Sequence, residues 1–298
     1  MNVLSLFDGM SCGQIALDQL GIKVDNYFAS EIDKWAMQIT QKNYPNTIQL
    51  GDVKKFDLSK LPEIGLLIGG SPCQGFSFAG KQLNFDDPRS ALFFVYVHIL
   101  QEIKPKYFLL ENVVMKKEYQ DVITQYLGVE PIKINSALVS AQNRNRLYWT
   151  NIPHIKQPED RGIVIKDILD DSQPVENYRT KNDDYIRPKI REMLGNSKYS
   201  DTFKFKWDSD DRILVTRPDG LKIQRIGRIA FPDNKAEIVT SLTQPHIAYR
   251  KLTPIECERL QTVPDNYTEG VSKSQRYKML GNGWTVEVIK HIFKNIVE

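Results

Sequence analysis

Asn2-Val-Leu-Ser-Leu-Phe-Asp-Gly-Met-Ser-Cys-Gly13 is the stretch that decides the fold of this chain. Its apolar half predicts a buried strand over Asn2–Phe7, and the glycine-containing turn that follows opens a helix over Cys12–Leu20. Such strand–helix alternation predicts an α/β fold with a parallel, doubly wound sheet, whose ligands bind beyond the carboxyl ends of the strands. Further strands are expected at Tyr27–Ser30, Thr47–Leu50, Leu66–Gly69 and Tyr107–Glu111, and further helices at Asp33–Asn43 and Leu92–Ile103.

Composition sets limits on the class of protein. The chain has 298 residues, 41% hydrophobic and 26% charged, which is ordinary for a soluble globular protein. It contains no apolar run long enough for a transmembrane helix, and its first residues predict a strand rather than a signal peptide. The net charge is only +3, so any basic surface for nucleic acid must be local. Three distant cysteines and four scattered histidines argue against a disulfide framework or a metal site, and a reducing cytoplasm is expected.

The character of the sequence changes twice along the chain. Residues 1–153 carry the strand–helix alternation, whereas residues 154–245 are polar, rich in turns and contain only short β-like pieces, Arg212–Thr216 and Leu221–Ile226. Apolar residues return at helical spacing over Val286–Ile296. We therefore expect a first domain over 1–153, a smaller mixed domain over 154–245, and a return to the first domain over 246–298.

The first three expected strands each end in a residue suited to a cofactor. Gly9 and Gly13 permit a tight turn before the helix, Glu31 can accept hydrogen bonds from ribose hydroxyls, and Asp52 can accept one from an adenine amino group. Each acid alone is more often a cap or a turn residue, and the turn lacks the G-x-G-x-x-G spacing of dinucleotide sites. Together they indicate an adenosine-containing cofactor without a pyrophosphate.

A second group of residues indicates covalent chemistry. Cys73 lies between Pro72 and Gln74, directly after the apolar run Leu66–Gly69, where a thiolate could face a substrate. Glu111 ends another strand, where burial would favour its protonated form, although a salt-bridged structural role is the alternative. Gln142, Arg144 and Arg146 alternate onto one face of an extended segment and could lower a thiol pKa, or could form an ordinary solvated basic strand.

The chain resembles the cytosine-C5 DNA methyltransferases. Pro72-Cys73-Gln74, Glu111-Asn112-Val113 and Gln142-x-Arg144-x-Arg146 are similar to that family's three catalytic motifs, in the family's order. Phe7-x-Gly9 and Gly281-Asn282 are similar to its first and last cofactor motifs, and Arg250–Gln261 to the motif that organises its recognition domain. The Phe-Asp-Gly-x-Ser-x-Gly loop and the Gly-Asn-Gly-Trp284 segment look closest to the animal de novo enzymes, but the length fits a compact bacterial or phage enzyme.

The resemblance implies a Rossmann-like sheet that binds S-adenosylmethionine and a target-recognition domain that binds double-stranded DNA. It implies that Cys73 attacks C6 of a flipped cytosine, that Glu111 contacts N3 and the amino group, that Arg146 contacts O2, and that Arg144 supports the thiolate. The loop Gly75–Ser90 is expected to close over the flipped base. Implied cofactor contacts are Phe7, Asp8, Gly9, Ser11, Cys12, Gly13, Glu31, Ile32, Asp52, Val53, Pro72, Leu92, Asn282, Gly283 and Trp284. Implied DNA contacts are Gln74, Ser77, Arg225, Arg228, Thr243 and Gln244.

An RNA cytosine methyltransferase would share these catalytic motifs, but the sizeable recognition region favours DNA. A non-catalytic DNA-binding homologue is the other alternative, and it would be expected to lack Cys73 or Glu111, which are both present. A nicotinamide-dependent Rossmann enzyme is disfavoured by the missing glycine spacing. A cognate restriction endonuclease is a possible partner, no membrane partner is expected, and the protein is expected to be a monomer or a weak dimer in the cytoplasm of a prokaryotic or phage-infected cell.

Overall fold

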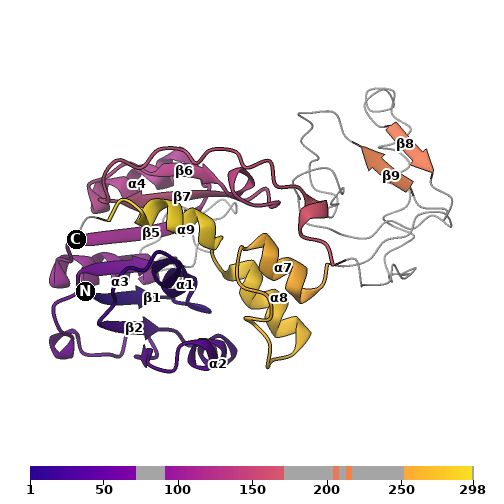
Figure 1. Cartoon of the computed structure of the whole chain (residues 1–298). Coiled ribbons are helices and arrows are strands. Elements are labelled where there is room, and N and C mark those ends of the chain that lie inside the picture. Colours follow the sequence, from indigo (N-terminus) through magenta and orange to yellow (C-terminus); the bar gives the residue numbers. More distant parts are fainter. Residues whose placement is uncertain (72–90, 171–203, 208–212, 217–251, 297–298) are drawn as a thin grey trace.

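The structure is a computed structural model that describes residues 1–71, 91–170, 204–207, 213–216 and 252–296 (Figure 1). Within these residues a seven-stranded sheet has the strand order β3-β2-β1-β4-β5-β7-β6. The strands are β1 (Asn2–Leu6), β2 (Asn26–Ser30), β3 (Ile48–Gln49), β4 (Leu66–Gly69), β5 (Tyr107–Val113), β6 (Ile132–Asn135) and β7 (Asn145–Thr150). The predicted doubly wound α/β fold is confirmed.

The prediction of a wholly parallel sheet is wrong for one strand. β1 to β5 pair in parallel, but β7 is antiparallel to both of its neighbours, β5 and β6. The connection from β6 to β7 covers only residues 136–144 and includes the short 3-10 helix η2 (Ser136–Leu138). A parallel crossover needs a dozen or more residues, so a short connection returns the chain in the opposite direction.

Helices cover both faces of the sheet. On one face lie α1 (Cys12–Gln19), α2 (Lys34–Asn43) and α9 (Val286–Phe293), and on the other lie α3 (Ala91–Ile103) and α4 (Lys117–Leu127). Alternate strand residues enter the two cores, as β1 shows: Val3 packs in the first core, and Leu4 and Leu6 pack in the second. The sheet is therefore buried on both sides, which explains the continuous apolar runs in its strands.

The C-terminal part of the chain lies against the N-terminal part. α9 packs against α1 (Figure 1). The side chains of Val286, Ile289 and Phe293 are fully buried in the core that also holds Val3. Before α9 come α7 (Pro254–Leu260) and α8 (Lys273–Asn282). Thr253 and Glu256 form a capping box at the start of α7.

Four further elements complete the described residues. They are the 3-10 helices η1 (Leu58–Lys60) and η3 (Ile165–Asp167), and an antiparallel pair of strands, β8 (Lys204–Trp207) and β9 (Ile213–Thr216). The expected β-like piece at Arg212–Thr216 corresponds to β9, whereas Leu221–Ile226 lies outside the described residues. No helix within the described residues is long and apolar enough to cross a bilayer.

Candidate active site

One pocket lies at the carboxyl ends of the parallel strands, with a volume of about 450 Å³. The turns after β1, β2, β3 and β4, the end of β5 and the segment before α9 all contribute to its wall. This is the position where doubly wound sheets bind their ligands. Twelve of the predicted cofactor residues line it: Phe7, Asp8, Gly9, Cys12, Glu31, Ile32, Asp52, Val53, Leu92, Asn282, Gly283 and Trp284.

The loop after β1 has an alternating left-handed backbone. Phe7, Gly9 and Ser11 have φ angles of 57°, 60° and 60°. The prediction that the strand includes Phe7 is therefore wrong, because a left-handed residue cannot continue a strand. Only glycine adopts this conformation without a steric penalty, so Phe7 and Ser11 must be held there by their surroundings.

Hydrogen bonds hold the loop in this conformation. The Ser11 hydroxyl donates to Oδ2 of Asp8, and the Tyr27 hydroxyl donates to Oδ1 of Asp8 at 2.8 Å. Burial raises the pKa of Asp8 to about 6, which the hydroxyl donors only partly oppose. Ser11 and Gly13 do not line the pocket, so as placed here they shape the loop from behind its wall.

Glu31 joins the end of β2 to the loop after β1. Its Oε2 accepts from the amide of Gly9 at 2.7 Å, and its Oε1 accepts from the amides of Ile32 and Asp33, each at 2.8 Å. A carboxylate has about four lone-pair sites, so one remains for a ligand hydroxyl. The neighbouring Ile32 side chain is 76% exposed, which gives the pocket an apolar rim.

The chemical end of the pocket is built around Glu111 at the end of β5. Its Oε1 forms a 2.8 Å ion pair with Nε of Arg146, and its Oε2 accepts from Nε1 of Trp284 at 3.2 Å. Burial raises the pKa of Glu111, whereas the charge of Arg146 opposes that rise. β7 runs antiparallel to β5, and Arg146 lies opposite Val113 in the register. Since Val113 and Glu111 are two residues apart on β5, they share one face of the sheet, and Arg146 is the diagonal neighbour of Glu111.

Arg144 and Gln142 occupy different environments from Arg146. The Arg144 guanidinium donates to the carbonyls of Gly281 at 3.2 Å and Gly283 at 2.9 Å, so it holds the segment before α9. The Gln142 side chain donates to the carbonyl of Leu260 and does not line the pocket. The prediction that these three side chains share one face is therefore wrong for Gln142, because only Arg144 and Arg146 reach the pocket.

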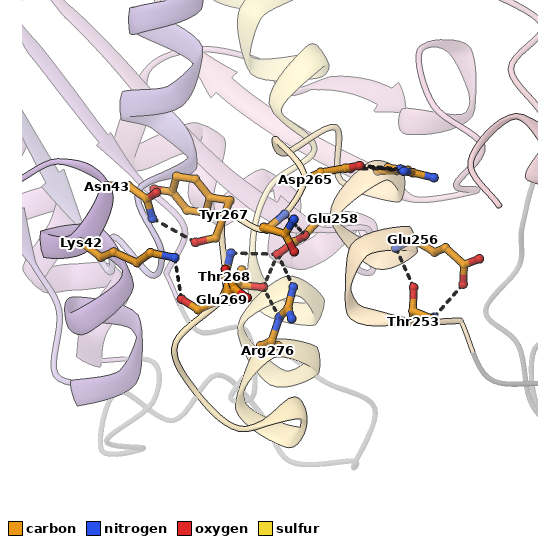
Figure 2. A network of polar contacts seen from close by, with 12 residues as sticks. Lys42, Asn43, Thr253, Glu256, Glu258, Asp265, Tyr267, Thr268, Glu269 and Arg276 are labelled. Atoms are coloured by element: carbon orange, nitrogen blue, oxygen red, sulfur yellow. Dashed lines mark hydrogen bonds and ion pairs between the residues drawn. The ribbon is translucent and has the colours of Figure 1, made fainter. Parts of the chain in front are cut away.

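A polar network fixes α7, the turn at residues 264–271 and α8 against the sheet domain (Figure 2). The fully buried Glu258 carboxylate accepts from the amides of Asn266 and Thr268 and pairs with Arg276 at 2.9 Å. The same turn contacts the loop after β1, because the Tyr267 hydroxyl donates to the carbonyl of Met10 at 2.8 Å.

Sequence reasoning missed several parts of this site. Tyr267 was not predicted, because its contact with Met10 joins residues 257 positions apart. Gly70 and Ser71 also line the pocket, and the Gly69-Gly70 pair after an apolar run was the signal for them. Asp33 lines the rim and pairs with Lys278 at 2.7 Å.

Other predicted residues cannot be placed. Cys73, Pro72, Gln74, Ser77 and the predicted lid Gly75–Ser90 lie outside the described residues, as do Arg225, Arg228, Thr243 and Gln244. Cys12 and Cys257 are free, and burial raises the pKa of each thiol to about 12. Among the described residues, no group of three His, Cys, Asp or Glu side chains could hold a metal ion.

A doubly wound sheet with a left-handed loop after β1 and acids after β2 and β3 defines a Rossmann-like fold of the methyltransferase type. The family described as C-5 cytosine-specific DNA methylase matches residues 1–298, and the chain belongs to this family.

Curated relatives from bacteria match this chain over most of their own length. The chain is 31% identical to the Type II methyltransferase M.NlaX of Neisseria lactamica over 97% of this chain and 94% of the relative. It is 30% identical to the Type II methyltransferase M1.ScrFI of Lactococcus lactis subsp. cremoris over 99% of this chain and 78% of the relative. Among solved structures, the Entamoeba histolytica methyltransferase EhMeth shares the fold with a TM-score of 0.66, at 18% identity and over 100% of this chain and 99% of that one.

Proposed function

We propose that this DNA cytosine-C5 methyltransferase uses S-adenosylmethionine as its methyl donor and Cys73 as its nucleophile. The observation that carries the proposal is the position of Glu111. Its buried carboxyl group shares one pocket with the loop after β1 and with Glu31. A group that can contact a base therefore lies beside a site suited to a nucleoside.

The pocket fits S-adenosylmethionine in three respects. Glu31 keeps one lone-pair site for a ribose hydroxyl, Ile32 offers an apolar face to an adenine ring, and Asp52 can accept from the adenine amino group. When bound there, the cofactor supplies a methyl group activated by its sulfonium. The amides of the loop after β1 and Trp284 would hold its remaining part.

The protein's own residues make cytosine reactive. C5 of cytosine is a poor nucleophile, and addition of the Cys73 thiolate to C6 forms an S–C6 bond and moves the C5–C6 π electrons towards C5. Glu111 in its protonated form, which burial favours, donates its proton to N3 and accepts a hydrogen bond from the amino group, which stabilises the charge that develops on the ring. Once C5 carries the methyl group, a base removes the C5 proton and the S–C6 bond breaks, which restores the aromatic ring and releases the Cys73 thiolate.

Double-stranded DNA is the proposed substrate. The target atom is inaccessible within a duplex, so the cytosine must be flipped into the pocket. We assign the recognition of its surroundings to the region after Asp170, with Arg225, Arg228, Thr243 and Gln244 as candidate base contacts and Gln74 and Ser77 beside the flipped base. The names of the bacterial relatives as Type II methyltransferases support a cognate endonuclease as a partner and a prokaryotic cytoplasm as the location.

Cys73→Ser is the direct test. We expect it to abolish methyl transfer and covalent trapping on duplex DNA that contains 5-fluorocytosine, because a serine hydroxyl is far less nucleophilic than a thiolate. Binding of S-adenosylmethionine should persist. Cys257→Ser is the matched control, since Cys257 does not line the pocket, and it should retain both activities. Trapping by Cys73→Ser, or methylation of transfer RNA but not DNA by the wild type, would refute the proposal.

A further inference from the structure

The carboxyl group of Glu111 is held at both of its oxygens. Nε of Arg146 lies 2.8 Å from Oε1, and the indole Nε1 of Trp284 lies 3.2 Å from Oε2. Guanidinium and indole N–H groups can donate but not accept hydrogen bonds. The two donors therefore fix the plane of the carboxyl group and leave its remaining lone pairs to face the pocket.

The Trp284 side chain is itself fixed between two glycines. A Cβ atom on Gly70 would lie 3.1 Å from Nε1 of Trp284 and 3.1 Å from Oε2 of Glu111. A Cβ atom on Gly13 would lie 3.6 Å from Cζ3 of Trp284. The indole thus lies against the start of α1 and the end of β4. The missing Cβ of Gly70 leaves room for its Nε1 beside Glu111, whereas the distance at Gly13 is an ordinary van der Waals contact.

The residues on both sides of Trp284 are also held in place. Nη2 of Arg144 donates to the carbonyl of Gly283 at 2.9 Å. On the other side, the Thr285 hydroxyl donates to Gln261 at 2.8 Å and accepts from Ser136 at 2.8 Å. A side chain fixed at its ring and at its backbone can orient another group without much loss of conformational entropy on catalysis.

We propose that Trp284 is a positioning residue for the methylation reaction, which orients Glu111 towards the target base through its indole N–H. The inference rests on the proposed function of Glu111 and adds to it. Trp284 lies between the cofactor side of the pocket and the base side. The same ring therefore lines the cofactor site and orients the Glu111 carboxyl group towards the base. Arg144 contributes to this positioning because it holds the Gly283 carbonyl, in addition to its expected support of the Cys73 thiolate.

The first test observes the hydrogen bond without catalysis. The chain has four tryptophans, so ¹H–¹⁵N spectra of the full chain give few indole N–H signals, and Trp284→Phe assigns the relevant one. We expect Glu111→Gln to shift the Trp284 indole signal, because the carboxylate acceptor is replaced by a neutral amide. The Trp149 indole donates to Thr124 at 3.1 Å outside the pocket and should not shift. The proposal would be overturned if both indole signals shifted, or if neither did.

The second test separates positioning from cofactor binding. Trp284→Phe keeps an aromatic ring but loses the donor, so we expect kcat to fall about ten- to a hundredfold, the range for a hydrogen bond to a charged group. The Kd for S-adenosylmethionine should change less than about threefold, since the removed N–H is bonded to Glu111. Trp149→Phe is the matched control and should leave both unchanged. An unchanged kcat, or a loss confined to cofactor affinity, would overturn the inference. A wild type inactive on DNA would instead refute the proposed function, and the spectra would still decide the role of Trp284.

Discussion

The Asp8 carboxyl in the loop after β1 makes the stability of the fold depend on pH. Burial raises its pKa to about 6, against an ordinary value of 3.8. A carboxyl whose pKa is higher in the folded state binds its proton more tightly there than in the unfolded chain. Its contribution to stability is therefore fully present below the unfolded pKa and is lost as the pH rises through the folded pKa.

This sign gives a measurable prediction for Asp8→Asn. Between about pH 4 and about pH 7 the wild type should lose roughly 2 kcal/mol of unfolding free energy relative to the variant, from 1.36 kcal/mol per pKa unit. Urea unfolding across this range measures the difference. Asp57→Asn is the control, because hydrogen bonds from Ser59 lower the pKa of the exposed Asp57 from 3.8, so its contribution changes little across this range. A slope for Asp57→Asn as steep as that for Asp8→Asn would contradict the assignment.

At the scale of elements, the connection of α7 to α8 depends on one buried ion pair. Figure 2 shows Arg276 beside Glu258, and these side chains are 12% and 0% exposed. Those of Arg259 and Asp265, which form a second ion pair, are 33% and 44% exposed. Removing one partner of a buried pair leaves the other charge buried without compensation. In an exposed pair, water solvates the charge that remains, so the loss of stability is small.

Arg276→Met should therefore destabilise the protein by about 3 to 5 kcal/mol. Asp265→Asn, the matched change in the exposed pair, should cost less than about 1 kcal/mol. The midpoints of urea unfolding at neutral pH compare the two. Similar midpoints for both variants would mean that the Glu258 network does not hold these helices together.

The elements also mark which parts of the molecule the sequence could predict. The strands and helices of the first half follow from local apolar periodicity. Glu31, Asp52 and Glu111 share one pocket because each lies at the carboxyl end of a parallel strand, and these ends meet at one edge of the sheet. The reversal of β7 and the contact of Trp284 with Glu111 were not predictable in this way. Both depend on where distant segments return to the sheet, which side-chain periodicity does not encode.

At the scale of the whole molecule, the segment that ends at Asp170 and the segment that begins at Leu252 contact each other. Ile165 and Ile168 are buried against Leu260, and Leu169 and Leu252 pack on the same cluster. The amide of Asp170 donates to Glu256 at 2.8 Å, and Arg161 pairs with Glu287 at 2.7 Å. We therefore propose that the recognition region begins after Asp170 and ends before Leu252, rather than spanning residues 154–245.

Two deletions distinguish these boundaries. Replacing residues 172–250 by about eight Gly and Ser residues, which can span roughly 25 Å, keeps both anchored ends. This variant should unfold cooperatively and bind S-adenosylmethionine but lose methylation of duplex DNA, because its core and pocket are intact and its recognition region is gone. Replacing residues 155–245 by the same linker also removes Ile165, Ile168 and the Arg161 ion pair, so this variant should be markedly less stable. Calorimetry and cofactor titration measure both properties, and equal stability of the two variants would place the boundary near residue 154 instead.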